Sequence, residues 1–195
     1  MKILNASDIE VVCFSKDEHA DMLIPFSCGQ QEEHQSIAQY FFDCQKHPDA
    51  KLYVVKNTSD GDIIGLFALS CSSIIKMIDD ASRNDTLPAI ELKAFALSEK
   101  YQHKTVSPDI TIGDLVLGFI KATVKWIVTN ICGARYLILY SVASAERFYT
   151  RNGFAAFDQY IYSSPGSFSE GCTGMFMNIE DVFNTCHIVR YKREQ

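Results

Sequence analysis

The residues best placed for chemistry lie within 133–157, and Tyr149 is at their centre. Residues 133–141 form an apolar run rich in strand-forming side chains, and residues 142–152 favour a short helix that contains Phe148 and Tyr149. A strand that ends where a helix begins is the place where open α/β sheets bind ligands. A phenol stays protonated at pH 7, so Tyr149 is able to donate a proton there. The alternative interpretation, that the two aromatic residues fill the core, stays open.

Alternating strands and helices must position this stretch. Strand-forming runs predict strands at residues 9–14, 51–56, 63–71, 89–97, 133–141, 154–162 and 173–179. Apolar residues at helical spacing predict helices at residues 30–45 and 112–130, the second with a broad apolar face. Residues 16–24 are expected to form either a short helix or a polar connection. Gly153 is expected to end the helix that carries Tyr149. The segment 72–88 shows no regular pattern and is expected to be an exposed loop.

The composition predicts one globular domain over residues 1–195, with residues 180–195 as a C-terminal tail. A chain of 195 residues with 47% hydrophobic residues is large enough for a full core. The net charge of -6 argues against a broad basic surface.

Seven cysteines without a CxxC pair and five scattered histidines predict reduced thiols and no metal site. With no signal peptide and no apolar run of ~20 residues, the chain is expected in the cytoplasm.

Three motifs together resemble GNAT-type N-acetyltransferases. Residues 148–154, FYTRNGF, resemble the FYxxxGF signature that closes the coenzyme A site of that family. Residues 95–102, FALSEKYQ, resemble its central strand and the opening of its pyrophosphate loop. Residues 26–29, FSCG, resemble the toxin-like branch, whose members acetylate aminoacyl-tRNA. The motifs follow the family order along nearly the whole chain.

The resemblance implies the GNAT acyl-CoA N-acyltransferase fold, an α/β fold with a mixed central sheet of about six to seven strands flanked by helices. It also implies direct transfer of an acetyl group from the co-substrate acetyl-CoA to a primary amine. Tyr149 would be the general acid, because its phenol can protonate a thiolate whose thiol has a pKa of roughly 8.5. The residues that would contact the cofactor are Phe95, Ala96, Leu97, Gln102, His103, Lys104, Ile112, Gly113, Asp114 and Phe148.

Glu91 is the candidate general base. It lies four residues before Phe95, on the same strand face, as does the glutamate base in the histone-acetylating branch of the family. A partly buried carboxylate can accept the proton of an attacking amine. The alternative is an ordinary pair of Glu91 with Lys93, and both interpretations stay open.

The expected phosphate loop departs from the family pattern, which is Gln/Arg-x-x-Gly-x-Gly/Ala. If Gln102 sets the register, Thr105 and Ser107 stand where the family has glycine. Residues 106–110 therefore resemble an insertion, and Gly113 is the match for the last glycine. The Lys104 and His103 side chains, or the backbone N–H groups of 111–114, are the remaining candidates for holding a pyrophosphate.

Three functions are compatible with the sequence. The first is an acetyltransferase for a primary amine, with residues 72–88 either as a wall of the acceptor site or as plain surface. The second is a toxin-like enzyme that acetylates charged tRNA, the one nucleic-acid partner expected. The third is a catalytically silent module of the same fold. A homodimer is compatible with each of them, and no membrane partner is expected.

Overall fold

The chain divides into two compact units. Our computed structural model describes residues 6–29, 39–41, 43, 49–78, 83–157, 161–163 and 171–185. The first unit comprises Met1–Leu69 and Ala94–Phe119, and the second comprises Ser70–Lys93 and Ile120–Gln195. Strands β3 (Ile63–Ile78) and β4 (Arg83–Leu97) and helix α3 (Ile112–Asn130) contribute to both units. No helix in the described ranges has the length and apolar character that a membrane crossing requires.

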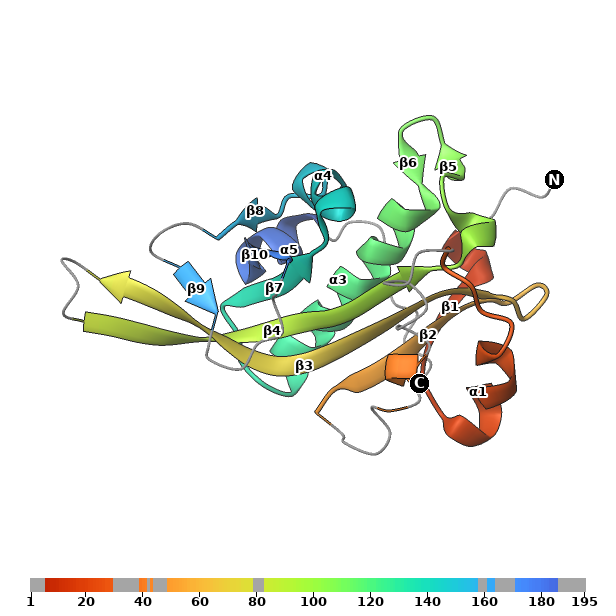
Figure 1. The fold of residues 1–195 in the computed structure, drawn as a ribbon, viewed down its shortest axis with the longest axis horizontal. Helices are drawn as coiled ribbons and strands as arrows, with labels where there is room; N and C mark the ends of the chain where they lie inside the picture. Colours follow the sequence, from red (N-terminus) through yellow and green to blue (C-terminus); the bar gives the residue numbers. More distant parts are fainter. Residues whose placement is uncertain are drawn as a thin grey trace. The chain divides into compact units, whose positions relative to one another are not determined.

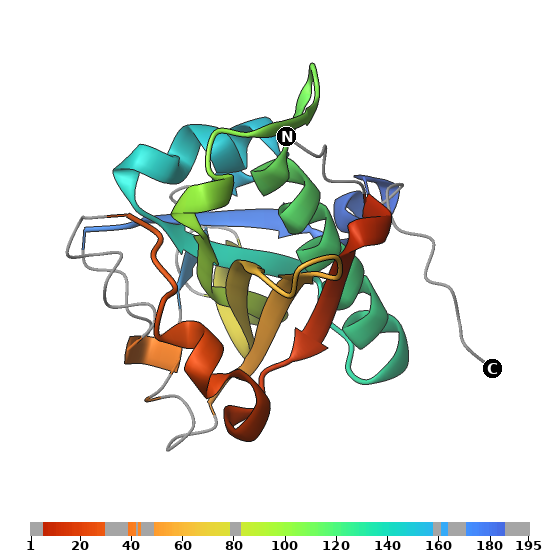
Figure 2. The same cartoon turned by 90° about the vertical axis from the view of Figure 1, so that its right-hand side faces the viewer.

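Antiparallel strands build the first unit. After a single 3-10 turn, η1 (Ala6–Asp8), strand β1 (Ile9–Cys13) pairs with β2 (Lys51–Asn57), as Figure 2 shows in red and orange. Strand β2 then pairs with the first part of β3, which it reaches through a turn at Gly61 with a positive φ of 77°. Helix α1 (Lys16–Leu23) packs Leu23 into an apolar core with Phe41, Leu52, Val54, Ile63, Leu66 and Ala68.

The rest of the first unit leads into the main helix. After β4 ends at Leu97, a 3-10 turn, η2 (Glu99–Tyr101), is followed by a small hairpin of β5 (Thr105–Ser107) and β6 (Ile110–Thr111). Helix α3 begins at the next residue, and Figure 1 shows the hairpin beside its N-terminal end. The predicted insertion at residues 106–110 is therefore a β-hairpin, and the predicted bounds of α3 are confirmed.

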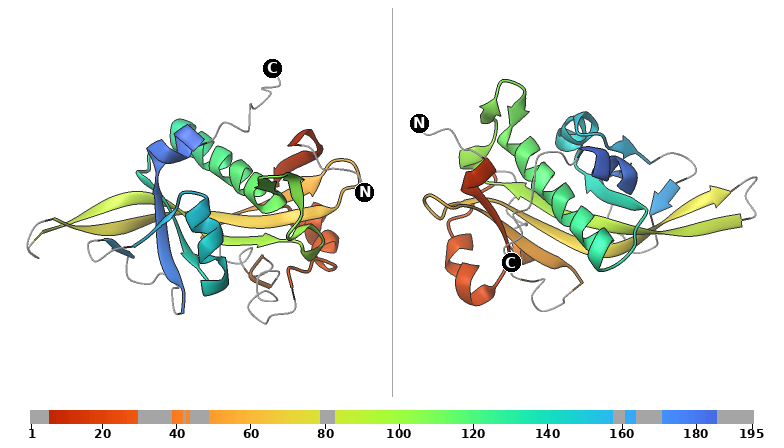
Figure 3. Two further views of the ribbon diagram at one scale, coloured as in Figure 1. Left: turned by 90° about the horizontal axis from the view of Figure 1, so that it is seen from above. Right: turned by 180° about the vertical axis from the view of Figure 1, so that it is seen from behind.

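The second unit contains a parallel strand pair. The first part of β4 runs parallel to β7 (Tyr136–Ser141), with pairs from Ala89↔Tyr136 to Leu92↔Leu139. Strand β10 (Thr173–Asn178) lies antiparallel to β7 and to the short β8 (Ala155–Ala156), as Figure 3 shows. The second part of β3 pairs with β9 (Ile161–Ser163). Turn η3 (Ala143–Ala145), helix α4 (Glu146–Arg151) and helix α5 (Ile179–Thr185) complete the described elements.

Together these pairings give a mixed sheet flanked by helices, as predicted. The hydrogen-bonded order of its eight described strands is β1-β2-β3-β4-β7-β10-β8, with β9 paired to β3. Sheets that combine parallel and antiparallel neighbours arise where one strand pair is joined through a crossover helix, and here α3 connects β4 to β7.

The prediction of an irregular loop over residues 72–88 is wrong. Strand β3 continues to Ile78 and β4 already begins at Arg83, so the described parts of this segment are extended strands. Serines and acidic residues interrupt the apolar pattern that would indicate a strand in this segment. In the structure, Ile74 and Leu87 are buried in a core with Ala89 and Ile138. Pairing with β9 and this burial override the weak local propensity.

Other predicted elements differ at their ends. The strand predicted over residues 154–162 is described only as β8 and β9, and residues 158–160 lie outside the description. Most of the helix predicted over residues 30–45 also lies outside the described residues, although 39–41 and 43 are helical. Helix α5, with Val182 fully buried, occupies the start of the segment expected to be a tail.

Candidate active site

Tyr149 lies in α4 with its side chain buried. It is 8% exposed, and its ring packs edge-on against Phe148 and Phe154, with ring centres 5.1 and 5.7 Å away. Burial raises the pKa of the Tyr149 phenol well above its ordinary value, because the phenolate would be poorly solvated. The side chain therefore keeps its proton at physiological pH, and its role as general acid stays a prediction.

The C-terminal end of α4 holds Tyr149 by backbone hydrogen bonds. The N–H groups of Asn152 and Phe154 both donate to the carbonyl oxygen of Tyr149, at 3.0 and 3.1 Å. Gly153 has a φ of 90°, and a Cβ added there would lie 2.9 Å from the Met177 Cε. The Met177 Cε is the end of a flexible side chain and can move, but a side chain would be strained at this φ, so the turn favours glycine. Gly153 ends the helix as predicted.

Strands β4 and β7 form a parallel ladder. The recorded pairs run from Ala89↔Tyr136 to Leu92↔Leu139, and both strands continue beyond them. The Tyr140 hydroxyl is buried without a hydrogen-bond partner among the described residues.

Glu91 lies on the paired part of the same strand. It faces Ile138 across the ladder and is 7% exposed. The side chain of Lys93, two residues further along the strand, is exposed. The role of Glu91 as general base stays a prediction, and so does the alternative of an ordinary pair with Lys93.

In the first unit, the end of β4 is bound closely to β3. The Ser98 N–H donates to the Ile64 carbonyl at 2.9 Å, and a Cβ added at Gly65 would lie 2.8 Å from the Ala96 oxygen. Ala96 is buried, and Phe95 and Leu97 are partly exposed. The predicted role of this segment in aligning a pantetheine arm through its backbone stays a prediction.

Gln102 and the FSCG motif are joined in this unit. The Gln102 side-chain amide donates to the carbonyl oxygens of Cys28 and Leu97, at 2.8 and 2.9 Å. The Glu99 N–H donates to the Ser27 carbonyl at 2.8 Å. The amide donors of Gln102 are therefore used for fixing the start of the loop, and sequence reasoning missed this contact between two motifs that are far apart in the chain.

The N-terminal end of α3 is capped from within the chain. The Thr111 N–H donates to Asp114 Oδ2 at 2.9 Å, and the Asp114 N–H donates to Thr111 Oγ1 at 3.1 Å. The Ile112 N–H donates to the Lys104 carbonyl at 2.8 Å. This is a reciprocal capping box, and the Thr-x-x-Asp spacing was the sequence signal for it. Three N–H groups that were candidates for binding a pyrophosphate thus already have acceptors.

The cationic candidates lie on the same loop. His103 has a positive φ of 56°, and its side chain is exposed. The Lys104 ammonium lies 5.7 Å from the centre of the Tyr101 ring, a cation–π contact. Gly113 is buried in the first turn of α3. Lys104, His103 and the Gly113 N–H are the groups of this loop that remain for binding an anion.

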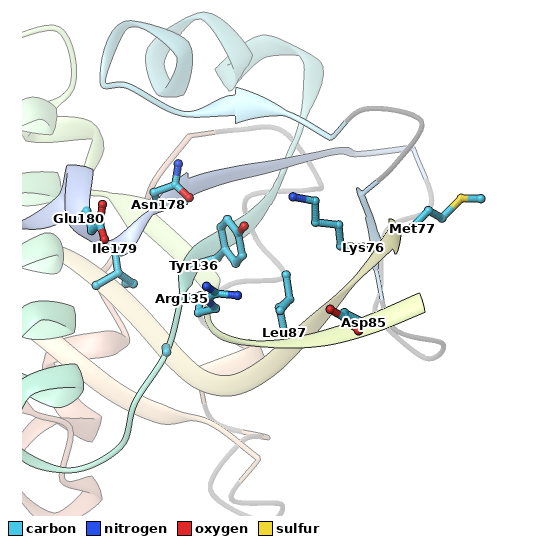
Figure 4. A pocket seen from close by; sticks show the side chains of 10 residues that line it. Lys76, Met77, Asp85, Leu87, Arg135, Tyr136, Asn178, Ile179 and Glu180 are labelled. Carbon is cyan, nitrogen blue, oxygen red and sulfur yellow. The ribbon is translucent and has the colours of Figure 1, made fainter. Parts of the chain in front are cut away.

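A hollow of about 650 Å³ lies in the second unit, where β7 begins (Figure 4). It contains none of the predicted site residues. Two cationic and two anionic side chains line it, so it does not select a ligand by the sign of its charge. Its lining residues are Lys76, Met77, Asp85, Leu87, Ala134, Arg135, Tyr136, Asn178, Ile179 and Glu180. Within the described ranges, no group of His, Cys, Asp and Glu side chains is arranged to hold a metal ion.

Comparison with known proteins identifies the fold. No protein-family model matches the sequence, and no curated protein matches it significantly. Solved structures do match, over nearly the whole chain. A structure described as a bacterial toxin has a TM-score of 0.70 at 17% identity, covering 95% of this chain and 98% of its own. This chain has the GNAT acetyltransferase fold, as predicted.

The particular structures that it resembles include the toxin AtaT. A structure of AtaTR bound with AcCoA has a TM-score of 0.69 at 14% identity and covers 91% of this chain and 98% of its own. A complex of AtaT with acetyl-methionyl-tRNAfMet has a TM-score of 0.64 at 14% identity, with coverages of 91% and 98%. The predicted likeness to the toxin-like branch is confirmed at the level of the fold.

Proposed function

We propose that this chain is an acetyl-CoA-dependent N-acetyltransferase in which Tyr149 is the general acid. The observation that carries the proposal is the buried, neutral phenol of Tyr149 in the helix that follows β7, within a GNAT fold. Its raised pKa keeps the proton on the oxygen at physiological pH. The phenol can then donate this proton to the sulfur of coenzyme A as the thioester bond breaks.

The reaction that we propose is a direct transfer. The nitrogen of the acceptor amine attacks the thioester carbonyl carbon, and the carbon–sulfur bond then breaks. The sulfur takes its proton from Tyr149, and the new amide nitrogen loses its extra proton to Glu91 or to water. Transfer of that proton to the phenolate restores the enzyme, so the products are an acetylated amine and free coenzyme A.

The acceptor that we favour is the α-amine of an aminoacyl-tRNA. A protein of the same fold, AtaT, has been captured with acetyl-methionyl-tRNAfMet. An α-amine has a pKa of about 7.7–8.0, so a useful fraction of it is neutral at physiological pH and a weak base suffices. The net charge of -6 means that tRNA would have to be held by a local patch rather than by a broad basic surface.

The pyrophosphate of acetyl-CoA would be held differently from the family pattern. In the proposed complex, Lys104 provides positive charge, and the His103 side chain and the Gly113 N–H provide hydrogen-bond donors. The self-capped start of α3 favours a second candidate function, a silent module of the same fold that does not bind acetyl-CoA. Thermal unfolding separates the two, since a ligand at 100 times its dissociation constant adds about 2.7 kcal/mol of stability.

The test of activity uses charged tRNA and a matched pair of tyrosine variants. The purified chain is incubated with acetyl-CoA and aminoacylated tRNA, and acetylated aminoacyl ends and free thiol are both measured. Tyr149→Phe should abolish most of the activity. Tyr53→Phe removes a hydroxyl from β2, in the other unit, and should leave activity unchanged. Release of thiol only with small amines would assign the enzyme to that acceptor class, and no acetyl transfer to any amine would refute the proposal.

A further inference from the structure

Lys121 lies on the buried side of α3. Its side chain is 5% exposed, and the neighbouring Ile120 and Val124 belong to the apolar core. An ammonium group buried in this way loses its hydration, so it persists in a folded protein only where fixed acceptors replace the water. The position of the acceptor for the Lys121 ammonium therefore indicates which part of the structure the buried charge stabilises.

That acceptor is at the end of the helix that carries Tyr149. The Lys121 Nζ donates to the carbonyl oxygen of Asn152 at 2.8 Å, and it lies 5.9 Å from the centre of the Phe154 ring. Asn152 is the residue that follows α4, and the C-terminal end of a helix carries partial negative charge. The cation is therefore bound by a carbonyl, a helix dipole and the face of an aromatic ring.

The residues that Lys121 contacts are also those that hold Tyr149. Asn152 and Phe154 both donate their N–H groups to the Tyr149 carbonyl, and the Phe154 ring packs against the Tyr149 ring. A change in the position of either residue would move the backbone and the ring of Tyr149 together. Asn152 and Phe154 therefore connect Lys121 to Tyr149.

We propose that Lys121 is a positioning residue for Tyr149. Its buried ammonium fixes the turn at residues 152–154, and that turn fixes the place of the phenol. The kinetic consequence rests on the proposed acetyltransferase function, whereas the structural consequence does not. Lys125 provides a matched control, because it lies one turn further along α3 and contacts the Phe183 ring at 5.1 Å without any described contact to α4.

The experiment measures the chemical shift of the Tyr149 ring by NMR. The chain is labelled with ring-¹³C tyrosine, and the Tyr149 signal is assigned as the one lost in Tyr149→Phe. Because the rings of Phe148 and Phe154 shift this signal, it reports the place of the phenol. In Lys121→Met we expect it to move towards the position of an unstructured tyrosine. In Lys121→Arg, which keeps the charge and the donors, and in Lys125→Met it should stay close to its wild-type position.

The same proteins are then compared in the acetyl-transfer assay. For Lys121→Met we expect a kcat about 10- to 100-fold below wild type, because a misplacement of about 1 Å can cost about 10²-fold in rate. The KM for acetyl-CoA should change less than about twofold. If Lys121→Met does not fold, Lys121→Gln replaces it, with the same expectations.

Three outcomes separate the positioning role from the proposed acetyltransferase function. A folded Lys121→Met protein with a wild-type Tyr149 signal would overturn the positioning role, whatever its activity. If the signal moves as expected but wild type transfers no acetyl group to any amine, the positioning of Tyr149 stands and the proposed acetyltransferase function fails. A moved signal with an unchanged kcat would overturn the positioning role in catalysis.

Discussion

Two helix ends, one in each unit, differ in how well they match the motifs of the GNAT family. The C-terminal end of α4 follows it: Gly153 adopts a positive φ, and the hydrogen bonds of Asn152 and Phe154 fix Tyr149. The N-terminal end of α3 departs from it. Where the family presents free N–H groups to a phosphate, Thr111 and Asp114 cap each other.

The difference shows what each end can tolerate. The turn at Gly153 depends on a conformation and a close approach that a side chain would disturb, so its sequence is restricted. The start of a helix needs only that its N–H groups find acceptors, and a carboxylate serves as well as a phosphate. The conformation at the end of α4 can thus be predicted from its residues, whereas the residues at the start of α3 do not specify a single acceptor.

The largest effect should come from the α4 side. Removing the Tyr149 hydroxyl in Tyr149→Phe should lower kcat by about 10²- to 10⁴-fold, the usual contribution of a general acid, with little change in KM. Tyr53→Phe is the control for a lost tyrosine hydroxyl. A Tyr149→Phe enzyme with more than about half of the wild-type kcat would show that the phenol is a packing residue.

A second test compares two glycines by stability. Gly153→Ala should lower the free energy of unfolding by about 1–3 kcal/mol, because it combines a positive φ with a Cβ 2.9 Å from Met177. Gly133→Ala should have a small effect, since an added Cβ there meets nothing within 4 Å. Urea denaturation of both variants measures the difference. Equal stabilities would mean that the turn at Gly153 relaxes easily.

The sequence predicted the elements whose signals are local. The bounds of α3, the strand before Tyr149 and the turn at Gly153 follow from residues close together in the chain. No local signal shows which strands pair with each other. The parts of β3 and β4 that depend on pairing were therefore missed, and both strands were predicted too short. The buried Lys121 could have been noticed, because it interrupts the apolar face of α3, but its acceptor at Asn152 is 31 residues away and could not be predicted.

A third test concerns the α3 side. In Asp114→Asn the side chain keeps its shape but loses its charge, so the cap should weaken and the free energy of unfolding should fall by about 0.5–1 kcal/mol. If a phosphate binds beside this helix, removing the carboxylate should also lower the Kd for acetyl-CoA about 3- to 10-fold, because like charges repel. Asp109→Asn, at the exposed tip of the same hairpin, is the control.

Titration calorimetry and urea denaturation of the two variants give both quantities. A weaker cap without tighter binding of acetyl-CoA would place the pyrophosphate away from this helix end. Equal changes in Asp114→Asn and Asp109→Asn would mean that the net charge of the loop matters and the capping box does not.

The smallest effect is the pH dependence of stability that Tyr149 contributes. Its folded pKa is raised above the ordinary value near 10, so above that pH the unfolded chain loses this proton before the folded chain does. The stabilisation is therefore fully present below about pH 10 and is lost as the pH rises further, by up to about 1.4 kcal/mol per pH unit. Tyr149→Phe should remove this part of the slope, and Tyr53→Phe should keep it. Chemical denaturation between pH 8 and 11 measures both slopes, and identical slopes in the two variants would mean that the Tyr149 phenol is well solvated.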